Sequence, residues 1–458
     1  MAEFTLREVL TVTGGTYNGK ASETTVFTNV STDTRTIEEG SLFVALTGDT
    51  FDGHDFLPQA RANGALGALV KPGHTANDLI CIEVASPLLA YQQLANYHRR
   101  RFDIPVVAVT GSSGKTTTKE MIAAVLGSKF NVLKTEKNFN NEIGLPKTLL
   151  QLTADHEACV VEMGMRRLGQ IDELARIAEP TVGVITNVGN SHIELLGSRE
   201  NIAKAKSELI QHIPVDGTAI LNEDDEFVRQ MGNLTKGKII YYGIKEKATI
   251  SGFKLRYKKD GIKFTCRSFD EVFDVFLPMI GEHNVYDALA AIAVGRSLGV
   301  SSQKIAKALG SFKGMPMRQE IVSFGDFVVL NDAYNANPMS MAESIKALGQ
   351  LDGKRKIAML GDMLELGEFS EEHHREIGRL LVAEGYDQVY TFGEAAKFIA
   401  REAKAAGIRI AKICDSHLDM VNVYCDVRAK GDVILVKGSR GLRMERVVNE
   451  FEDREALQ

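Results

Sequence analysis

The chain has 458 residues, which is too long for a single hydrophobic core and favours two or three domains. A formal net charge of −6 at pH 7, without clusters of Lys and Arg among aromatic residues, argues against a nucleic-acid-binding protein. The sequence has no run of about 18 uncharged apolar residues and no signal-peptide core at its start. We therefore expect a cytoplasmic protein that does not insert into a membrane.

The five cysteines are scattered and odd in number, and no pair has the C-x-x-C spacing of a metal or redox site. Cys159 and Cys266 lie inside apolar runs that are typical of buried strands. We therefore expect free thiols in a reducing compartment rather than a disulfide framework.

Residues 1–100 predict a small N-terminal α/β domain. Helical patterns occur in FTLREVLTVTGG, FLPQARANG and LLAYQQLANYHRRRF, and two strands flank a polar turn in VFTNVSTDTRTIEEGSLFVAL. Two polar clusters interrupt this pattern, STDTR at 31–35 and FDGHDF at 51–56. From spacing alone, a solvated turn and a ligand-binding role are equally open for both clusters, and a lone histidine such as His54 is more often structural.

A strand–loop–helix motif occupies residues 106–121, with the sequence VVAVTGSSGKTTTKEM. Gly111 and Gly114 would let the backbone curl around an anion, and the start of the following helix would direct N–H groups at it. Lys115 would face the outer phosphates of a nucleotide, and the Thr116 hydroxyl would reach Mg²⁺. The alternative is a plain strand–helix turn, but the Lys-Thr pair at this spacing favours phosphate binding.

Residues 101–312 alternate apolar strands with helices, which predicts a doubly wound and mostly parallel central sheet. The strand patterns are NVLKT, ACVVEMG, TVGVITNV, GTAILN and KIIYYG, and an antiparallel hairpin is expected within 248–280. Glu162, Asn187 and Asn222 come at the ends of three of these strands. Because such sheets bind ligands at the carboxyl ends of their strands, we expect these side chains at the same edge as the phosphate loop.

Residues 313–458 restart the alternation, which predicts a second doubly wound, Rossmann-like α/β domain. Strand patterns occur in FVVLNDAY, KIAMLG, QVYTFG and DVILVKG, between helices such as PMSMAESIKAL and HHREIGRLLVAEG. The polar residues expected at its ligand-binding edge are Asp332, Tyr334, Asn335, Asn337, Asp362, Lys437, Ser439 and Arg440.

Candidate metal ligands lie close to the phosphate loop in this scheme. Glu162 ends a buried strand, from which a carboxylate commonly holds the Mg²⁺ of a nucleotide, with a structural salt bridge as the alternative. His192 follows another strand end and would be an ordinary loop histidine unless a second Mg²⁺ has to be held there. Lys204 and Lys206 are two residues apart on a predicted helix and so face different sides, although periodicity alone makes both of them surface lysines.

Nine motifs occur in order along the chain: TGSSGKTTTKEM, NFNNEIGLP, EMG, NVGNSHIELLGSRENIAKAKSEL, LNEDD, GEHNVYDALAAIAV, NDAYNANPMSM, GDMLELGE and VKGSRGLRMERVV. Over nearly the whole chain they resemble those of the Mur ligases, ATP-dependent amide-bond enzymes of peptidoglycan precursor synthesis. STDTR, FVALTGDTFDGHDF, DAYNANP and VKGSR favour the branch that joins D-alanyl-D-alanine to UDP-N-acetylmuramoyl-tripeptide. The resemblance implies a three-domain α/β fold, ATP and two Mg²⁺ as cofactors, and these two substrates, and we expect a monomer.

The resemblance also implies site residues. Those expected to bind ATP are Gly111, Ser112, Ser113, Gly114, Lys115, Thr116, Thr117, Asn138, His283, Asn284, Arg318, Asp332 and Tyr334. Those expected to hold metal are Thr116, Glu162, His192 and an N-carbamoylated Lys206. Those expected in catalysis are Lys115, His192 and Lys206. Those expected to bind substrate are Ser31, Thr32, Arg35, Asn335 and Asn337.

The chemistry that the resemblance implies starts with transfer of the γ-phosphoryl group of ATP to a substrate carboxylate. An amine then attacks the acyl phosphate and expels phosphate. Another Mur ligase or a folylpolyglutamate synthase-like ligase is the nearest alternative. A regulatory P-loop ATPase and a non-catalytic nucleotide-binding scaffold are alternatives of other classes, but no guanine-reading N-K-x-D follows the loop, since NEDD at 222–225 is not that pattern.

Overall fold

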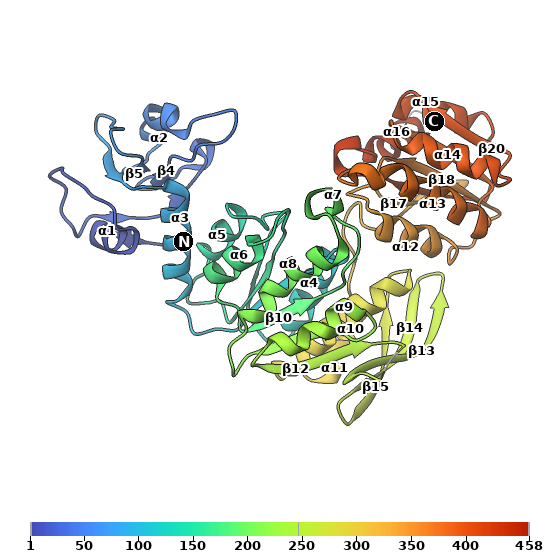
Figure 1. Cartoon of the computed structure of the whole chain (residues 1–458), viewed down its shortest axis with the longest axis horizontal. Coiled ribbons are helices and arrows are strands. Elements are labelled where there is room, and N and C mark those ends of the chain that lie inside the picture. The colour runs from blue at the N-terminus through green and yellow to red at the C-terminus, as the bar shows by residue number, and fades with distance from the viewer. Residues whose placement is uncertain (1, 246, 457–458) are drawn as a thin grey trace.

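The structure of the chain, a computed structural model, describes residues 2–245 and 247–456. Three lobes follow one another along the molecule, each built on its own mainly parallel sheet (Figure 1). The N-terminal lobe is blue, the central lobe runs from cyan through green to yellow, and the C-terminal lobe is orange to red. The predicted three-domain α/β class is therefore confirmed.

The N-terminal lobe carries the first strands and helices of the chain. Its elements are β1 (Phe4–Thr5), α1 (Leu6–Thr13), β2 (Val26–Phe27), β3 (Val30–Ser31), η1 (Thr34–Thr36), β4 (Leu42–Val44), η2 (Gly53–Phe56), α2 (Leu57–Ala62), β5 (Gly67–Val70), β6 (Ile80–Glu83) and α3 (Pro87–Arg99). Strands β3 to β6 form one parallel sheet, and β1 pairs with β2 separately. The strands predicted on either side of the polar turn are β3 and β4, with η1 between them. Helix α3 contacts α1 as well as helices of the central lobe, and so joins the two lobes.

The central lobe contains the largest sheet. Its strands are β7 (Val106–Thr110), β8 (Val132–Lys134), β9 (Ala158–Glu162), β10 (Val182–Ile185), β11 (Thr218–Asn222), β12 (Lys238–Gly243), β13 (Ile250–Lys258), β14 (Gly261–Ser268) and β15 (Glu271–Leu277). They run in the order β15-β14-β13-β12-β11-β10-β7-β9-β8, and only β13-β14 and β14-β15 pair antiparallel. The predicted hairpin is a three-stranded insert, because the half-exposed β15 adds a further antiparallel strand.

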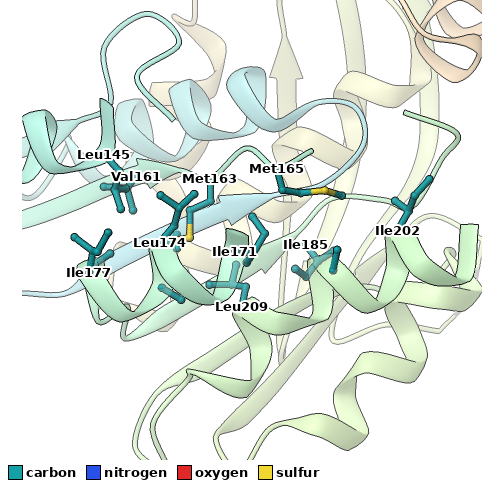
Figure 2. Close-up of a cluster of buried hydrophobic side chains, with 14 of the residues drawn as sticks. Leu145, Val161, Met163, Met165, Ile171, Leu174, Ile177, Ile185, Ile202 and Leu209 are labelled. Carbon is teal, nitrogen blue, oxygen red and sulfur yellow. The ribbon is translucent and has the colours of Figure 1, made fainter. Parts of the chain in front are cut away.

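Helices cover both faces of the central sheet. They are α4 (Lys115–Leu126), α5 (Gly144–Leu149), α6 (Gln170–Ala178), α7 (Ile193–Leu196), α8 (Arg199–Gln211), α9 (Glu226–Gln230), η3 (Met231–Leu234), α10 (Glu282–Ser297) and α11 (Ser302–Gly310). Figure 2 shows the core under α6 and α8, where Ile171, Leu174 and Leu209 point at the strands beside Val161 and Ile185. Each such side chain contributes about 1.5–3 kcal/mol when it leaves water, which fixes the strands that carry the site. On the opposite face α10 packs against α4 and the sheet.

The C-terminal lobe repeats the doubly wound plan. Its elements are β16 (Glu320–Phe324), β17 (Phe327–Asp332), α12 (Pro338–Leu348), β18 (Arg355–Gly361), η4 (Gly367–Phe369), α13 (Ser370–Ala383), β19 (Gln388–Phe392), α14 (Ala396–Ala405), β20 (Ile410–Cys414), α15 (His417–Cys425), β21 (Asp432–Lys437), η5 (Arg440–Leu442) and α16 (Glu445–Ala456). The strand order is β16-β17-β21-β18-β19-β20, and only β16 pairs antiparallel. The edge strands β16 and β20 are additions to the predicted set.

Two predictions about composition can be compared with the structure. Within the described residues, no helix is both long and apolar enough to cross a membrane. The cysteines are free, and Cys159 and Cys266 are buried as predicted. Burial raises the pKa of both thiols to about 12, so neither is a reactive thiolate at neutral pH.

Candidate active site

A cavity of about 630 Å³ opens between the central and C-terminal lobes. Both lobes contribute to its wall, which places the carboxyl ends of two parallel sheets around one space. The predicted residues that line it are Gly111, Ser112, Ser113, Gly114, Lys115, Thr116, Thr117, Asn138, Glu162, His192, Lys206, His283, Asn284, Arg318, Asp332, Tyr334, Asn335, Asn337, Lys437 and Arg440. Asp362 and Ser439, which were expected at the same edge, do not line it. Their individual roles stay predictions.

The phosphate loop connects β7 to α4 through two glycines in left-handed conformation. Gly111 has φ +154° and Gly114 has φ +79°. A Cβ atom on Gly111 would lie 1.8 Å from Oγ1 of Thr186, and one on Gly114 would lie 2.5 Å from Oδ1 of Asp287. No side chain caps the start of α4, so its first N–H groups stay available to an anion in the cavity.

Polar side chains from neighbouring strands hold the loop in place. The amide N–H of Ser113 donates to Oδ1 of Asn187 over 2.8 Å, and the hydroxyl of Thr186 donates to the Ser113 carbonyl over 2.6 Å. Asn222 in turn donates to the Thr186 carbonyl over 2.9 Å. Asn187 and Asn222 therefore hold the loop at one edge of the sheet. Glu162 ends β9 at the same edge, since it pairs in parallel register with Val109 of β7, as the strand-end rule predicts.

Lys115 and Thr116 stand at the start of α4. Nζ of Lys115 donates to the carbonyl of Gly111 over 2.8 Å, and burial in the cleft lowers its pKa. Oγ1 of Thr116 accepts a hydrogen bond from the guanidinium of Arg318 over 3.0 Å. The same guanidinium lies 4.1 Å from the centre of the Tyr334 ring, a cation–π contact that orients it toward the loop.

Glu162 has a carboxylate that is only half satisfied. The residue is 3% exposed, and its Oε1 accepts from Nδ2 of Asn140 over 2.8 Å. Its Oε2 is buried and has no hydrogen-bond partner among the described residues. A buried carboxylate oxygen without a partner is costly unless something positive occupies the space beside it, so this atom fits a divalent cation.

Lys206 is buried whereas its neighbour Lys204 is exposed. Lys206 is 2% exposed, and no carboxylate of the described residues forms an ion pair with it. Burial, followed by the nearby charge of Lys115, lowers the pKa of Lys206 well below its ordinary value. Its amine is therefore disposed to be neutral inside the cavity wall.

The far end of the cavity is formed by α10 and the loop before β16. Asn284 is 2% exposed and donates to the Ile280 carbonyl over 2.6 Å and to Oε1 of Gln319 over 2.7 Å, beside His283. Asp287 accepts from the Thr118 hydroxyl over 2.7 Å, and burial raises its pKa to about 7. These residues offer amide and imidazole groups on one side of the cavity.

The C-terminal edge is tightly hydrogen-bonded. Oδ2 of Asp332 lies 2.5 Å from Nζ of Lys437 and accepts from the Ser344 hydroxyl. Asn335 accepts from the backbone of Arg440 over 3.1 Å. Asn337 caps α12 and also donates to the hydroxyl of Ser191 over 2.8 Å, a direct bond between the two lobes.

Some cavity residues were not predicted from the sequence. Asn140, Arg166, Gln319 and Glu343 all line the wall. Asn140 lies in the NFNNEIGLP motif, but its bond to Glu162 depends on a loop meeting the end of β9. Glu343 lies in the middle of α12, where periodicity gives no functional signal, and burial raises the pKa of its carboxyl.

Three predicted substrate residues are placed elsewhere. Ser31, Thr32 and Arg35 lie in the N-terminal lobe and do not line the cavity. Ser31 is 8% exposed and donates to the Asp33 carbonyl, whereas the Arg35 guanidinium is exposed and pairs with the Asp33 carboxylate over 2.8 Å. A ligand that touches both sites would have to extend across the molecule.

The described residues contain no cluster of side chains that could bind a metal ion by itself. Within residues 2–245 and 247–456, no group of three His, Cys, Asp or Glu side chains is close enough to hold an ion. A metal at Glu162 would need the Thr116 hydroxyl, ligand oxygens or a modified side chain to complete its coordination.

Comparison with known proteins covers most of the chain. The family model described as "Mur ligase middle domain" matches residues 109–295, "Mur ligase, glutamate ligase domain" matches 317–440, and "Mur ligase family, catalytic domain" matches 26–111. A relative from Bacillus subtilis, UDP-N-acetylmuramoyl-tripeptide–D-alanyl-D-alanine ligase, is 38% identical over 98% of this chain and 99% of its own. The protein of the same name from Escherichia coli is 35% identical over 93% of each chain.

Solved structures show the same relationship. MurF from Acinetobacter baumannii superimposes with a TM-score of 0.92 at 32% identity and covers 98% of this chain and 99% of its own. MurF ligase from Thermotoga maritima in complex with ADP superimposes with a TM-score of 0.85 at 33% identity, over 94% of this chain and 98% of its own. Because these matches extend over all three lobes, the chain belongs to the Mur ligase family.

Proposed function

We propose that the chain joins D-alanyl-D-alanine to UDP-N-acetylmuramoyl-tripeptide in an ATP-dependent reaction that passes through an acyl phosphate, as a step of peptidoglycan precursor synthesis. One observation carries the proposal: an uncapped phosphate loop opens into a cavity whose other wall belongs to the C-terminal lobe. Such a cavity can hold a nucleotide and an acceptor together and can exclude water.

The three lobes divide this work in the proposal. Residues 1–100 bind the UDP end of the substrate, with Ser31, Thr32 and Arg35 near it. Residues 101–312 bind ATP, and residues 313–458 bind the acceptor and close over the nucleotide, with Asn335 and Asn337 at the substrate. In the proposal the chain acts as a monomer, and it acts in the cytoplasm, where ATP and UDP-linked precursors are made.

Protein groups in the cavity suit the charge of this reaction. Lys115 and Arg318 lie where negative charge would collect, at the start of α4. Two Mg²⁺ ions, held by Thr116, Glu162, His192 and Lys206, would neutralise the phosphates and the substrate carboxylate when bound. The unpartnered Oε2 of Glu162 supports this assignment.

Lys206 would need to change its charge to serve as a metal ligand. A neutral amine can add to CO₂ with loss of a proton, which turns the lysine into a carbamate. The lowered pKa of the buried Lys206 amine favours that neutral form. In the proposal, the carbamate supplies the negative side chain that the described residues do not otherwise provide at this position.

A phosphate-release assay tests the function. Purified protein is given ATP, Mg²⁺ and a panel of UDP-linked peptides and amine acceptors. We expect phosphate release only when a UDP-N-acetylmuramoyl-tripeptide and D-alanyl-D-alanine are both present. Equal release with neither substrate would instead identify a simple ATPase, and release with a single amino acid as the acceptor would identify another ligase of the family.

A further inference from the structure

Glu365 of the C-terminal lobe touches His192 of the central lobe. Oε2 of Glu365 lies 2.5 Å from the buried Nδ1 of His192, a close contact that falls outside regular hydrogen-bond geometry. The backbone N–H of Glu194 donates to the Glu365 carbonyl over 3.4 Å, and the Arg166 guanidinium lies 3.7 Å from the Glu365 carboxylate. One residue of the GDMLELGE motif thus meets three residues of the central lobe.

Both partners of this contact hold a strained backbone. His192 and Glu365 each have φ +62°, in the left-handed region that non-glycine residues seldom adopt. Such conformations are energetically unfavourable and persist only where surrounding contacts fix them, most often at functional sites. The strain points to a selected geometry at this place, because an ordinary loop contact would not need it.

The geometry also decides which ring nitrogen of His192 is engaged. Nδ1 is buried against Glu365, so Nε2 is the nitrogen left for a ligand. A carboxylate at Nδ1 keeps the proton there and raises the basicity of Nε2, which is the arrangement that suits a metal-ligating histidine.

We propose that Glu365 is a positioning residue that sets the tautomer and orientation of His192 for metal binding, and that it does so only when the C-terminal lobe is closed on the central lobe. The inference deepens the proposed function, because it rests on a Mg²⁺ near His192. Closure would then complete the metal site, and an open enzyme would bind the second metal weakly.

Glu365→Gln tests the proposal with little change in shape. Glu368→Gln is the matched control, because Glu368 is exposed in the same loop. Mn²⁺ binding is titrated by electron paramagnetic resonance with a non-hydrolysable ATP analogue and UDP-N-acetylmuramoyl-tripeptide present. We expect Glu365→Gln to weaken the binding of one Mn²⁺ by about 10- to 100-fold with unchanged nucleotide affinity. Glu368→Gln should bind as the wild type does.

A second measurement reads the tautomer of His192 directly. Histidine ¹⁵N NMR of the wild type, with the His192 signal identified by its loss in His192→Gln, reports the tautomer. We expect a proton on Nδ1 in the wild type and a mixture in Glu365→Gln. A wild-type proton on Nε2, or unchanged Mn²⁺ affinity in a folded Glu365→Gln, would overturn the proposal. Failure of the proposed function would show separately, as a wild type that ligates nothing.

Discussion

The guanidinium of Arg318 donates to the hydroxyl of Thr116 over 3.0 Å, which ties the segment entering the C-terminal lobe to the first turn of α4. Arg318 also stacks on Tyr334, so its position depends on the turn that follows β17 (Phe327–Asp332) as well. A bound triphosphate would meet this guanidinium at the mouth of the phosphate loop. In the proposed function, this contact would couple the placement of the C-terminal lobe to nucleotide binding.

Replacing Arg318 should weaken nucleotide binding more than folding. Arg318→Ala removes a charged hydrogen-bond donor worth about 1.5–3 kcal/mol, which corresponds to roughly 10- to 100-fold in affinity for ATP. Isothermal titration of the ATP analogue measures the change. Arg409→Ala, an exposed arginine of the same lobe, should leave the affinity unchanged. Equal affinities of both variants for the ATP analogue would show that Arg318 does not bind the nucleotide.

Lys206 and Lys204 form a matched pair on α8. Lys206→Ala should abolish ligation because a ligand of the metal is lost, and short carboxylates such as formate should restore part of the rate by filling the space. Lys204→Ala should behave as the wild type, since its side chain is in solvent. Phosphate release measures both. Wild-type turnover by Lys206→Ala would contradict a role of Lys206 in metal binding.

The phosphate loop has no room for a side chain at Gly114. Gly114→Ala combines a left-handed backbone, which costs about 1–2 kcal/mol, with a methyl group 2.5 Å from Asp287. Gly73→Ala carries the same backbone cost at φ +83°, with nothing within 4 Å of the added carbon. We expect Gly114→Ala to lose more thermal stability than Gly73→Ala, because only its added methyl group clashes, and we expect loss of nucleotide binding only in Gly114→Ala. Calorimetry and ligand titration separate the two effects.

His98 makes stability depend on pH. Burial lowers its pKa from 6.5 to about 4, and its Nε2 lies 2.9 Å from the Leu152 carbonyl. Between those values the unfolded chain binds a proton that the folded protein does not, so stability falls as the pH drops from 6.5 to 4, by about 3 kcal/mol at the lower limit. Unfolding of His98→Gln should show a shallower fall across this window.

Much of the fold follows from local pattern. The alternation of apolar strands and helices located β7 to β12 and the C-terminal strands β17, β18, β19 and β21, because buried parallel strands read as short apolar runs. The edge strands β16 and β20 are half exposed and mixed in composition, so they carry no such signal. The third strand of the insert, β15, was missed for the same reason.

Some residues of the candidate site could likewise be predicted from local sequence, and others could not. The position of Gly111, Gly114 and Lys115 in the cavity could be predicted, because they belong to one short motif of neighbouring residues. The burial of Lys206 could not be read from periodicity, since α8 is covered on that side by the cavity wall and its exposed neighbour has the same residue type. The Glu365–His192 contact joins residues 173 positions apart, and only the meeting of two lobes reveals it.

The central claim is that a substrate carboxylate is activated by phosphorylation in this cavity. UDP-N-acetylmuramoyl-tripeptide labelled with ¹⁸O in the reacting carboxyl group measures it directly. Transfer of the γ-phosphoryl group to a carboxylate oxygen, followed by attack of the amine at the carbonyl carbon, leaves one labelled oxygen on the released phosphate. The account predicts that ¹⁸O appears in the phosphate in step with ligation, whereas phosphate free of label while the amide forms would contradict it.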